Sequence, residues 1–232
     1  MKNSERFIIA FNKIEKFFEK EINEKKYIPF YRSVQLLKHT NATIDRYQDD
    51  LVEYSELRNA IIHERTEAHY AIAEPHDEVV ERIEKIEQEL TAPKLVIPTF
   101  QKELRTMQAE DTVKDVLKVI RETDFSQFPV YRSKQFVGLV TDKGITHWLA
   151  RNTNGDIDQL LLTPVMNLIE ENKSVRNYEF ISKEMTIYQA ERIFLEQLKK
   201  YKRLDALLIT EEGKEHQALL GMISTNDLIK IP

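Results

Sequence analysis

Cysteine and long apolar runs are both missing from this sequence, and each absence removes a class of protein. The 232 residues include no cysteine, so the chain has neither a disulfide framework nor a thiolate metal site. No apolar stretch approaches the roughly 20 residues that a membrane-spanning helix needs. The first residues lead directly into an amphipathic pattern and do not resemble a signal peptide. These absences predict a cytoplasmic protein without a membrane partner.

Glycine is also scarce, and its distribution divides the chain. All five glycines lie after residue 137, which fits an all-helical first part. Residues 1–91 carry 14 lysines and arginines against 19 acidic residues, so this part is a poor non-specific binder of nucleic acid. The histidines show no close metal-ligand spacing, and no glycine-rich phosphate loop of the usual kinds occurs. We therefore expect no metal.

Apolar residues at three- and four-residue spacing run through the chain before Pro93. Such stripes are typical of helices with one buried face. They predict a helical bundle over residues 1–92. The stripes consist of Phe7, Phe11, Ile14 and Phe18; Phe30, Val34 and Leu37; Ile44, Tyr47, Leu51, Tyr54, Leu57 and Ile61; and Val79, Ile83, Ile86 and Leu90.

After Pro93 the chain contains an internal repeat of helices and short strands. Thr112 and Thr186 each begin a predicted helix, with Asp115 or Gln189 three residues later as in a capping box. Two copies imply pseudo-twofold packing with clefts between them. The fold class predicted is multi-domain, with an α bundle followed by an α+β region at residues 93–232. The copies cover about residues 93–152 and 160–232, with strands at 128–131 and 136–141, and at 204–210 and 218–224.

The stretch from Gly221 to Asp227 combines three features of a ligand site. A strand ends at Gly221, and Ser224 and Asp227 then flank a helix start. The amide groups of a helix start attract phosphate, and a carboxylate in the first turn can accept hydrogen bonds from ribose hydroxyls. The same two residues also form an ordinary capping box that only starts a helix, so both interpretations stay open.

Residues 94–232 resemble a tandem pair of CBS domains, a module in which two repeats pack into a disc and bind adenine nucleotides in the clefts between them. The resemblance rests on the strand residues 128–131 and 138–141 and on their second-copy partners 205–209 and 221–227. It implies a regulatory protein that senses AMP, ADP, ATP or a cyclic dinucleotide, and we expect a homodimer. The alternative is that both clefts are empty and the disc serves only as a dimerisation platform.

The ligand signature of this family is complete in the second copy. It consists of glycine, two apolar residues, threonine or serine, two variable residues and aspartate, as from Gly221 to Asp227. The resemblance implies that Ser224 and Thr225 hydrogen-bond phosphate or ribose and that Asp227 holds the ribose hydroxyls. It also implies that apolar strand residues sandwich the base, namely Ile181 and Leu207.

The first copy keeps Thr141 but has Gly144 where the carboxylate of the signature belongs. This departure predicts one good nucleotide site rather than two, with Thr141 and Arg132 contributing phosphate contacts. A basic run, Lys199 to Arg203, precedes the core strand of the second copy. Such runs are usually solvated helix ends that complement the helix dipole, and the alternative is a phosphate lid for the nearby cleft.

The helical part contains a second candidate site, which begins at Arg58, continues with Asn59 and ends at His63. This pattern resembles the Arg-x4-His motif of HEPN domains, helical-bundle dimers that include metal-independent ribonucleases. A histidine can take the proton of an RNA 2′-hydroxyl while a guanidinium holds the phosphate.

Five residues on a straight helix turn about 500°, which leaves the two side chains roughly 140° apart. They converge only if the helix ends or bends, or if a partner chain supplies one. The alternative function is therefore a nucleotide-gated ribonuclease, with RNA as a partner only in that case.

Overall fold

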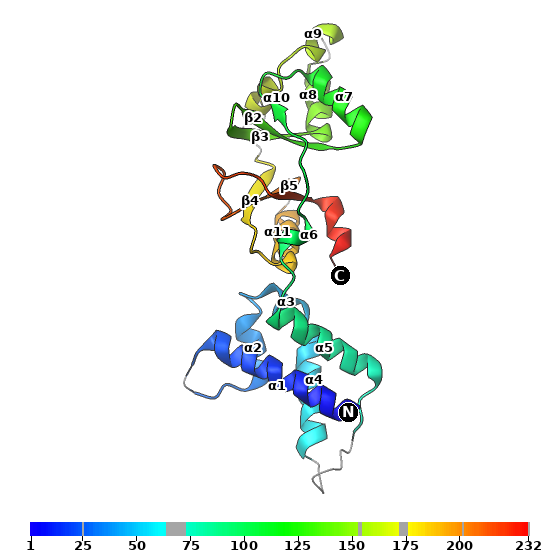
Figure 1. Cartoon of the computed structure of the whole chain (residues 1–232), viewed down its shortest axis with the longest axis vertical. Coiled ribbons are helices and arrows are strands. Elements are labelled where there is room, and N and C mark those ends of the chain that lie inside the picture. Colours follow the sequence, from blue (N-terminus) through cyan, green and yellow to red (C-terminus); the bar gives the residue numbers. More distant parts are fainter. Residues whose placement is uncertain (25, 64–72, 153–154, 172–175, 201, 232) are drawn as a thin grey trace. The chain divides into compact units, whose positions relative to one another are not determined.

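The chain forms two compact units, Met1–Lys94 and Leu95–Pro232, which we describe separately (Figure 1). Within the described residues, no helix is both long and apolar enough to cross a membrane. The computed structural model describes residues 1–24, 26–63, 73–152, 155–171, 176–200 and 202–231.

The first unit is helical, as the apolar stripes predict. Most members of these stripes are buried, including Phe7 and Ile14 of the first helix, which are both 0% exposed. The first helix packs chiefly along the last one. The described helices of this unit are α1 (Asn3–Ile22), α2 (Phe30–Leu37), α3 (Ala42–Arg46), α4 (Gln48–His63) and α5 (Asp77–Thr91).

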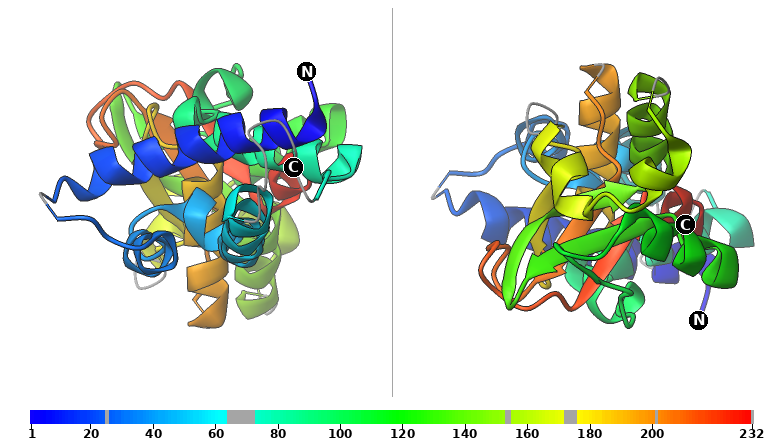
Figure 2. Two further views of the ribbon diagram at one scale, coloured as in Figure 1. Left: turned by 90° about the horizontal axis from the view of Figure 1, so that it is seen from below. Right: turned by 90° about the horizontal axis from the view of Figure 1, so that it is seen from above.

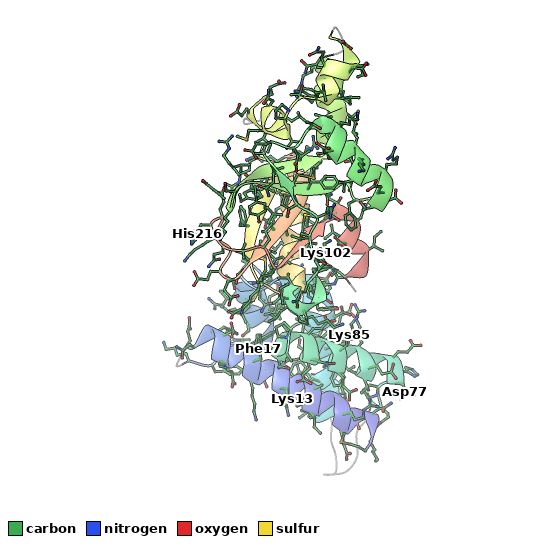
Figure 3. All side chains as sticks on the ribbon, turned by 45° about the horizontal axis from the view of Figure 1, so that its top comes forward. Lys13, Phe17, Asp77, Lys85, Lys102 and His216 are labelled. Atoms are coloured by element: carbon green, nitrogen blue, oxygen red, sulfur yellow. The ribbon has the colours of Figure 1, made fainter. Side chains whose placement is uncertain are left out.

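Charged pairs on the surface align α1 with α5. Arg6 donates from Nε and Nη2 to the carboxylate of Glu84 at 2.9 and 2.6 Å. About two helical turns further along α1, Lys13, which is labelled in Figure 3, places its Nζ 3.3 Å from the Oε2 atom of Glu87. Partly exposed ion pairs of this kind contribute little stability. The buried apolar stripes therefore hold the two helices together, and the ion pairs fix their alignment.

Two details of the helical unit differ from the expectation. The sequence predicts one helix over residues 44–61, whereas the structure divides it at Tyr47, whose φ of −105° and ψ of 17° end α3. In α5, Val80 is buried and Val79 is only partly buried. Either valine fits the helical spacing to Ile83, so only the packing against α1 decides which one enters the core.

Tyr54 of α4 gives this unit a predicted alkaline sensitivity. Its ring meets Phe7 edge-on at 5.6 Å, and burial, helped by Asp50, raises the pKa of its hydroxyl from 10.0 to about 12. A raised pKa means that the folded state keeps a proton which the unfolded chain releases above pH 10. We therefore expect the urea midpoint of the helical unit to fall as the pH rises from about 10 to about 12, and to fall less in Tyr54→Phe.

The exposed Tyr27, which is 81% accessible, provides the matched control for this titration. Tyr27→Phe should leave the alkaline fall of the midpoint as it is in the parent protein. An equal fall in Tyr54→Phe and in the parent would contradict the assignment to Tyr54.

The second unit contains two copies of a three-stranded sheet. In each copy the first strand runs parallel to the middle strand and the last runs antiparallel to it. The repeat predicts the middle and last strands. The structure adds the leading ones, and the second of these contains Ile181, which the family resemblance places on a strand. The sheets have the orders β1-β2-β3 and β4-β5-β6. Their strands are β1 (Met107–Gln108), β2 (Gln127–Arg132), β3 (Gln135–Thr141), β4 (Tyr178–Ser182), β5 (Ala206–Thr210) and β6 (Gly221–Ser224).

Helices surround these sheets, and the two predicted capping boxes start equivalent ones. The Thr112 N–H donates to Asp115 at 2.9 Å, and the Thr186 N–H donates to Gln189 at 2.9 Å. In both views of Figure 2, α8 and α11 extend on the same side of this unit. The helices are α6 (Val96–Thr99), α7 (Val113–Thr123), α8 (Asp142–Arg151), α9 (Ile157–Leu161), α10 (Val165–Glu171), α11 (Ile187–Lys199) and the 3-10 helix η1 (Thr225–Lys230).

The segment at residues 95–102 precedes the first copy in sequence but packs on the second. The Val96 N–H donates to the carbonyl of Met185 at 2.8 Å. Gln101 forms an isolated antiparallel bridge with Gly221 at the start of β6. This segment therefore covers part of the second copy that the repeat alone would leave open.

Candidate functional site

A cleft of about 410 Å³ lies between the two copies of the second unit. Its first-copy wall comes from β3, α8 and α10. Its second-copy wall comes from the start of β4 and from residues that flank β5 and β6. We call it the Thr141 cleft, after the residue at which β3 passes into α8.

The first turn of α8 has no N–H group left for a ligand. Thr141 Oγ1 accepts the N–H of Gly144 at 3.0 Å, and the Lys143 N–H donates to the carboxylate of Asp142 at 2.6 Å. The Asp142 N–H donates to the carbonyl of Ser126 at 3.0 Å. Because the first-turn donors that usually bind anions are occupied, side chains have to hold any phosphate in this cleft.

One face of α8 supplies such side chains. Gly144, His147 and Arg151 all line the cleft, and spacings of three and four residues place them on the same side of a helix. A Cβ at Gly144 would meet only Thr141 Oγ1 within 4 Å, at 3.1 Å. This face therefore begins with a glycine, at which a side chain would lie tightly against Thr141 Oγ1, and continues with basic side chains.

Arg203 faces α8 from the second copy and is already held in place. Its Nη2 donates to Thr141 Oγ1 at 3.0 Å, and its Nε donates to Asp205 at 2.8 and 3.0 Å. Asp205 in turn accepts the side-chain amide of Asn177 at 2.7 Å. Among the described residues, no acceptor binds Nη1 of Arg203. The guanidinium is thus oriented before a ligand arrives, which lowers the entropy cost of binding an anion.

The cleft also has an apolar lining, which includes Val137, Met166 and Tyr178. Burial raises the pKa of the Tyr178 hydroxyl, and the Glu215 carboxylate raises it further, against the opposite effect of Arg176. The Arg176 guanidinium lies 5.3 Å from the centre of the Tyr178 ring. The cleft therefore brings together an aromatic ring, apolar side chains and one carboxylate beside its basic groups.

The predicted site at Ser224 and Asp227 has a different environment. The backbone N–H and Oγ of Ser224 both donate to Asp227 Oδ2 at 2.9 Å. Lys102, labelled in Figure 3, lies 3.4 Å from the same oxygen, and Asp227 is only 7% exposed. Thr225 is exposed beside them. The carboxylate thus makes the capping contact at the start of η1, and a ribose there would share it with Lys102.

The remaining predicted nucleotide contacts lie in three different places. Ile181 and Leu207 sit on neighbouring strands and are buried, at 2% and 0% exposure. Arg132 ends β2, where its Nε lies 4.0 Å from Glu110. Of the predicted residues, the structure places Thr141 in the Thr141 cleft, whose lining includes neither Arg132 nor the two strand residues.

In the helical unit, Arg58 packs against the aromatic core. Its guanidinium lies 5.9 Å from the centre of the Phe11 ring, and its Nη1 donates to the Asn59 side chain at 3.3 Å. Its Nε is buried and has no acceptor among the described residues. His63 is the last residue of the continuous helix α4, and its side chain lies outside the described part. The catalytic role of these residues stays a prediction.

Comparison with known proteins identifies the second unit. A family model described as CBS domain matches residues 100–151 and, a second time, residues 173–232. This unit holds two CBS domains in tandem. The CBS pair therefore accounts for the repeat, the two sheets and the cleft between the copies. No curated protein matches the sequence.

Solved structures of low sequence identity resemble the CBS pair. The CBS domain pair of protein MJ0100, in complex with 5′-methylthioadenosine and S-adenosyl-L-methionine, is 14% identical with a TM-score of 0.42, over 60% of this chain and 94% of that chain. CBSX2 in complex with AMP is 16% identical with a TM-score of 0.44, over 59% and 94%. An uncharacterized conserved protein from Pyrococcus horikoshii is 19% identical with a TM-score of 0.45, over 59% and 90%.

Sequence reasoning found part of the Thr141 cleft and missed the rest. Thr141 comes from the signature, and Arg203 belongs to the basic run for which a phosphate lid is one interpretation. His147 and Arg151 were not predicted, although their spacing of three and seven residues from Gly144 along a helix was a usable signal. Glu215 lies in a loop without regular spacing, so only the tertiary structure brings it to the cleft.

Proposed function

We propose that the CBS pair is a regulatory sensor that binds an adenine nucleotide in the Thr141 cleft. The observation that carries this proposal is the combination of an apolar lining with the oriented guanidinium of Arg203. A volume of about 410 Å³ also lies within the roughly 300–1,000 Å³ usual for small-molecule sites. The cleft can therefore receive a base and a phosphate together.

Each part of a nucleotide has a partner of suitable chemistry in this cleft. Nη1 of Arg203, which has no acceptor within the described ranges, can donate to a phosphate oxygen in a charge-assisted hydrogen bond. The apolar side chains of Val137 and Met166 can cover a base, and the Tyr178 ring offers an aromatic surface. The carboxylate of Glu215 can accept a hydrogen bond from the exocyclic amino group of adenine.

Ser224, Thr225 and Asp227 form a second candidate position for the nucleotide, because they complete the ligand signature. Two observations favour the Thr141 cleft over it. Lys102 lies 3.4 Å from the carboxylate of Asp227 and would compete with ribose hydroxyls for it, and η1 is a 3-10 helix of only six residues. A helix this short aligns few peptide dipoles and attracts phosphate weakly.

The regulatory output follows from population shift. A nucleotide that touches both CBS copies favours the arrangement of the copies that binds it better. The favoured arrangement would then alter the helical unit, a homodimer contact or a separate partner. The nucleotide can shift the free-energy difference between the two arrangements by no more than the difference in its binding free energy for them.

Titration calorimetry with AMP, ADP, ATP and cyclic dinucleotides tests the proposal. We expect at least one of them to bind the parent protein and to bind Arg203→Gln about tenfold more weakly, because a charge-assisted hydrogen bond contributes about 1.5–3 kcal/mol. Arg192→Gln is the control, since Arg192 makes a more exposed pair with Glu196 on α11 and does not line the cleft.

The outcomes of this titration separate the two candidate positions. Heat from none of these nucleotides would refute the sensor function. A loss in Asp227→Ala, with binding by Arg203→Gln unchanged, would move the site to Ser224 and Asp227. A loss in Arg203→Gln alone supports the Thr141 cleft.

A further inference from the structure

We infer that Asp205 is a positioning residue for the nucleotide site, and that nucleotide affinity depends on its carboxylate although phosphate carries charge of the same sign. This inference rests on the proposed function, because it concerns the group that would hold the phosphate. Asp205 does not belong to the described lining of the Thr141 cleft. It therefore acts through the guanidinium of Arg203 and not through contact with the ligand.

The carboxylate of Asp205 contacts one edge of that guanidinium. Arg203 Nε lies 3.0 Å from Oδ1 and 2.8 Å from Oδ2, and Nη2 lies 2.7 Å from Oδ2. The pair is only partly accessible, with 28% of the arginine side chain and 18% of the aspartate side chain exposed. A contact through two nitrogens fixes the plane of a guanidinium as well as its position.

Asp205 is itself held by the neighbouring strand. β4 and β5 pair in parallel from Tyr178 and Ala206 onward, and Asn177 and Asp205 directly precede these two residues. The Asp205 N–H donates to the Asn177 carbonyl at 2.6 Å. The Asn177 side-chain amide donates to Asp205 Oδ2 at 2.7 Å. The register of the two strands therefore determines where the carboxylate lies.

The first copy supplies a second support for Arg203. Thr141 and Gln127 are partners in the register of β2 and β3. Thr141 Oγ1 accepts a hydrogen bond from Nη2 of Arg203 at 3.0 Å. The Gln127 side-chain amide donates to the carbonyl of Asp205 at 3.4 Å. The guanidinium thus lies between a carboxylate of the second copy and a hydroxyl of the first.

These contacts leave one nitrogen of the guanidinium for a ligand. Nε and Nη2 of Arg203 have partners, whereas within the described ranges no acceptor binds Nη1. Asp205 also offsets the positive charge of Arg203, so the pair offers a phosphate a directed donor and not surplus charge. Ordering a long side chain at the moment of binding costs affinity. Asp205 removes that cost, because it orders Arg203 before the nucleotide arrives.

The sign of the effect separates positioning from simple electrostatics. If charge alone mattered, removal of a carboxylate beside the guanidinium would strengthen the binding of an anion. If Asp205 positions Arg203, the same removal weakens binding. Asp205→Asn is the suitable change because it keeps the size of the side chain. Its amide has one acceptor oxygen in place of the two that now serve Nε and Nη2 of Arg203 and the amide of Asn177.

Titration calorimetry with AMP, ADP, ATP and cyclic dinucleotides tests the inference. For each nucleotide that binds the parent protein, we expect Asp205→Asn to bind about fivefold more weakly, from the cost of ordering one long side chain. Asp142→Asn is the control, because it removes a carboxylate one residue after Thr141 whose described contact is with the N–H of Lys143. It should bind as the parent does or more tightly. Circular dichroism on the same samples confirms that both variants are folded.

A double-mutant cycle shows whether Asp205 acts through Arg203. In Arg203→Gln the carboxylate has no guanidinium to position, so the addition of Asp205→Asn should change the affinity by less than about twofold. Arg203→Lys keeps the positive charge but loses the planar arrangement of donors. We therefore expect Arg203→Lys to bind about as weakly as Arg203→Gln.

The outcomes separate this inference from the proposed function. Binding by Asp205→Asn that equals or exceeds that of the parent would overturn the inference and leave the sensor function standing. An equal loss from Asp205→Asn with and without Arg203 would also overturn it, as would parent-like binding by Arg203→Lys. Failure of every adenine nucleotide to bind the parent protein would refute the sensor function, and the inference with it.

Discussion

Trp148→Ala is expected to lower the free energy of unfolding of the CBS pair by about 3–5 kcal/mol, as truncation of a large buried aromatic side chain does. Trp148 is 2% exposed and belongs to the core of the first copy, with Phe128 and Val140 among its members. It also lies on α8, next to His147 in sequence. The variant should therefore weaken nucleotide binding at temperatures where the protein is still folded. Urea unfolding monitored by circular dichroism measures the first effect.

Trp148→Phe separates the loss of packing from the loss of a polar group. The indole Nε1 is buried and has no hydrogen-bond partner among the described residues. Phenylalanine therefore loses volume without breaking a hydrogen bond, and we expect it to cost less than half as much as alanine. Equal losses in both variants would show that the indole makes a polar contact that this structure does not reveal.

Gly221→Ala is expected to destabilise the second copy by about 2 kcal/mol or more, because overpacking against a rigid neighbour forces the backbone to move. An ideal Cβ at Gly221 would overlap the carbonyl oxygen of Phe100. That oxygen belongs to backbone and cannot rotate away. We expect the segment at residues 95–102 to detach partly, which would also remove Lys102 from Asp227. Hydrogen exchange of the Val96 amide, which donates to the carbonyl of Met185 in the second copy, would report the detachment.

Gly155→Ala is the control for this substitution. A Cβ at Gly155 would meet its nearest neighbours at 3.4 and 3.7 Å, which is ordinary van der Waals contact. We expect its unfolding midpoint to stay close to that of the parent protein. If the unfolding midpoint of Gly221→Ala also stayed close to that of the parent protein, the close contact between Phe100 and β6 would not be maintained in solution.

Local patterns predicted most of the elements, because such patterns depend on residues a few positions apart. Helical spacing located the buried faces of α1 and α2. The capping boxes at Thr112 and Thr186 marked the starts of α7 and α11. The two-residue strand β1 was missed, since a strand that short has no alternation to detect. The division between α3 and α4 was also missed, because the apolar spacing continues across Tyr47.

Less of the Thr141 cleft than of the fold could be predicted from the sequence, for a related reason. The ligand signature pointed to Ser224 and Asp227, and the structure places Lys102 against that carboxylate. The structure shows an open cleft at Thr141, which lacks the signature carboxylate, and a nucleotide at Ser224 and Asp227 stays a prediction. A motif consists of residues that are close in sequence. It does not predict which residues from distant segments will contact them in the fold.

The sequence by itself determined a helical first part, a repeated α+β second part and the residues that start each repeat. Each of these depends on short-range spacing, capping or composition. The tertiary structure alone decided which residues line the Thr141 cleft and which charges face it. Arg203, Glu215 and Arg151 come together only when the two copies pack, and Lys102 reaches Asp227 across 125 positions of sequence. Contacts at such separations depend on packing, which no local pattern encodes.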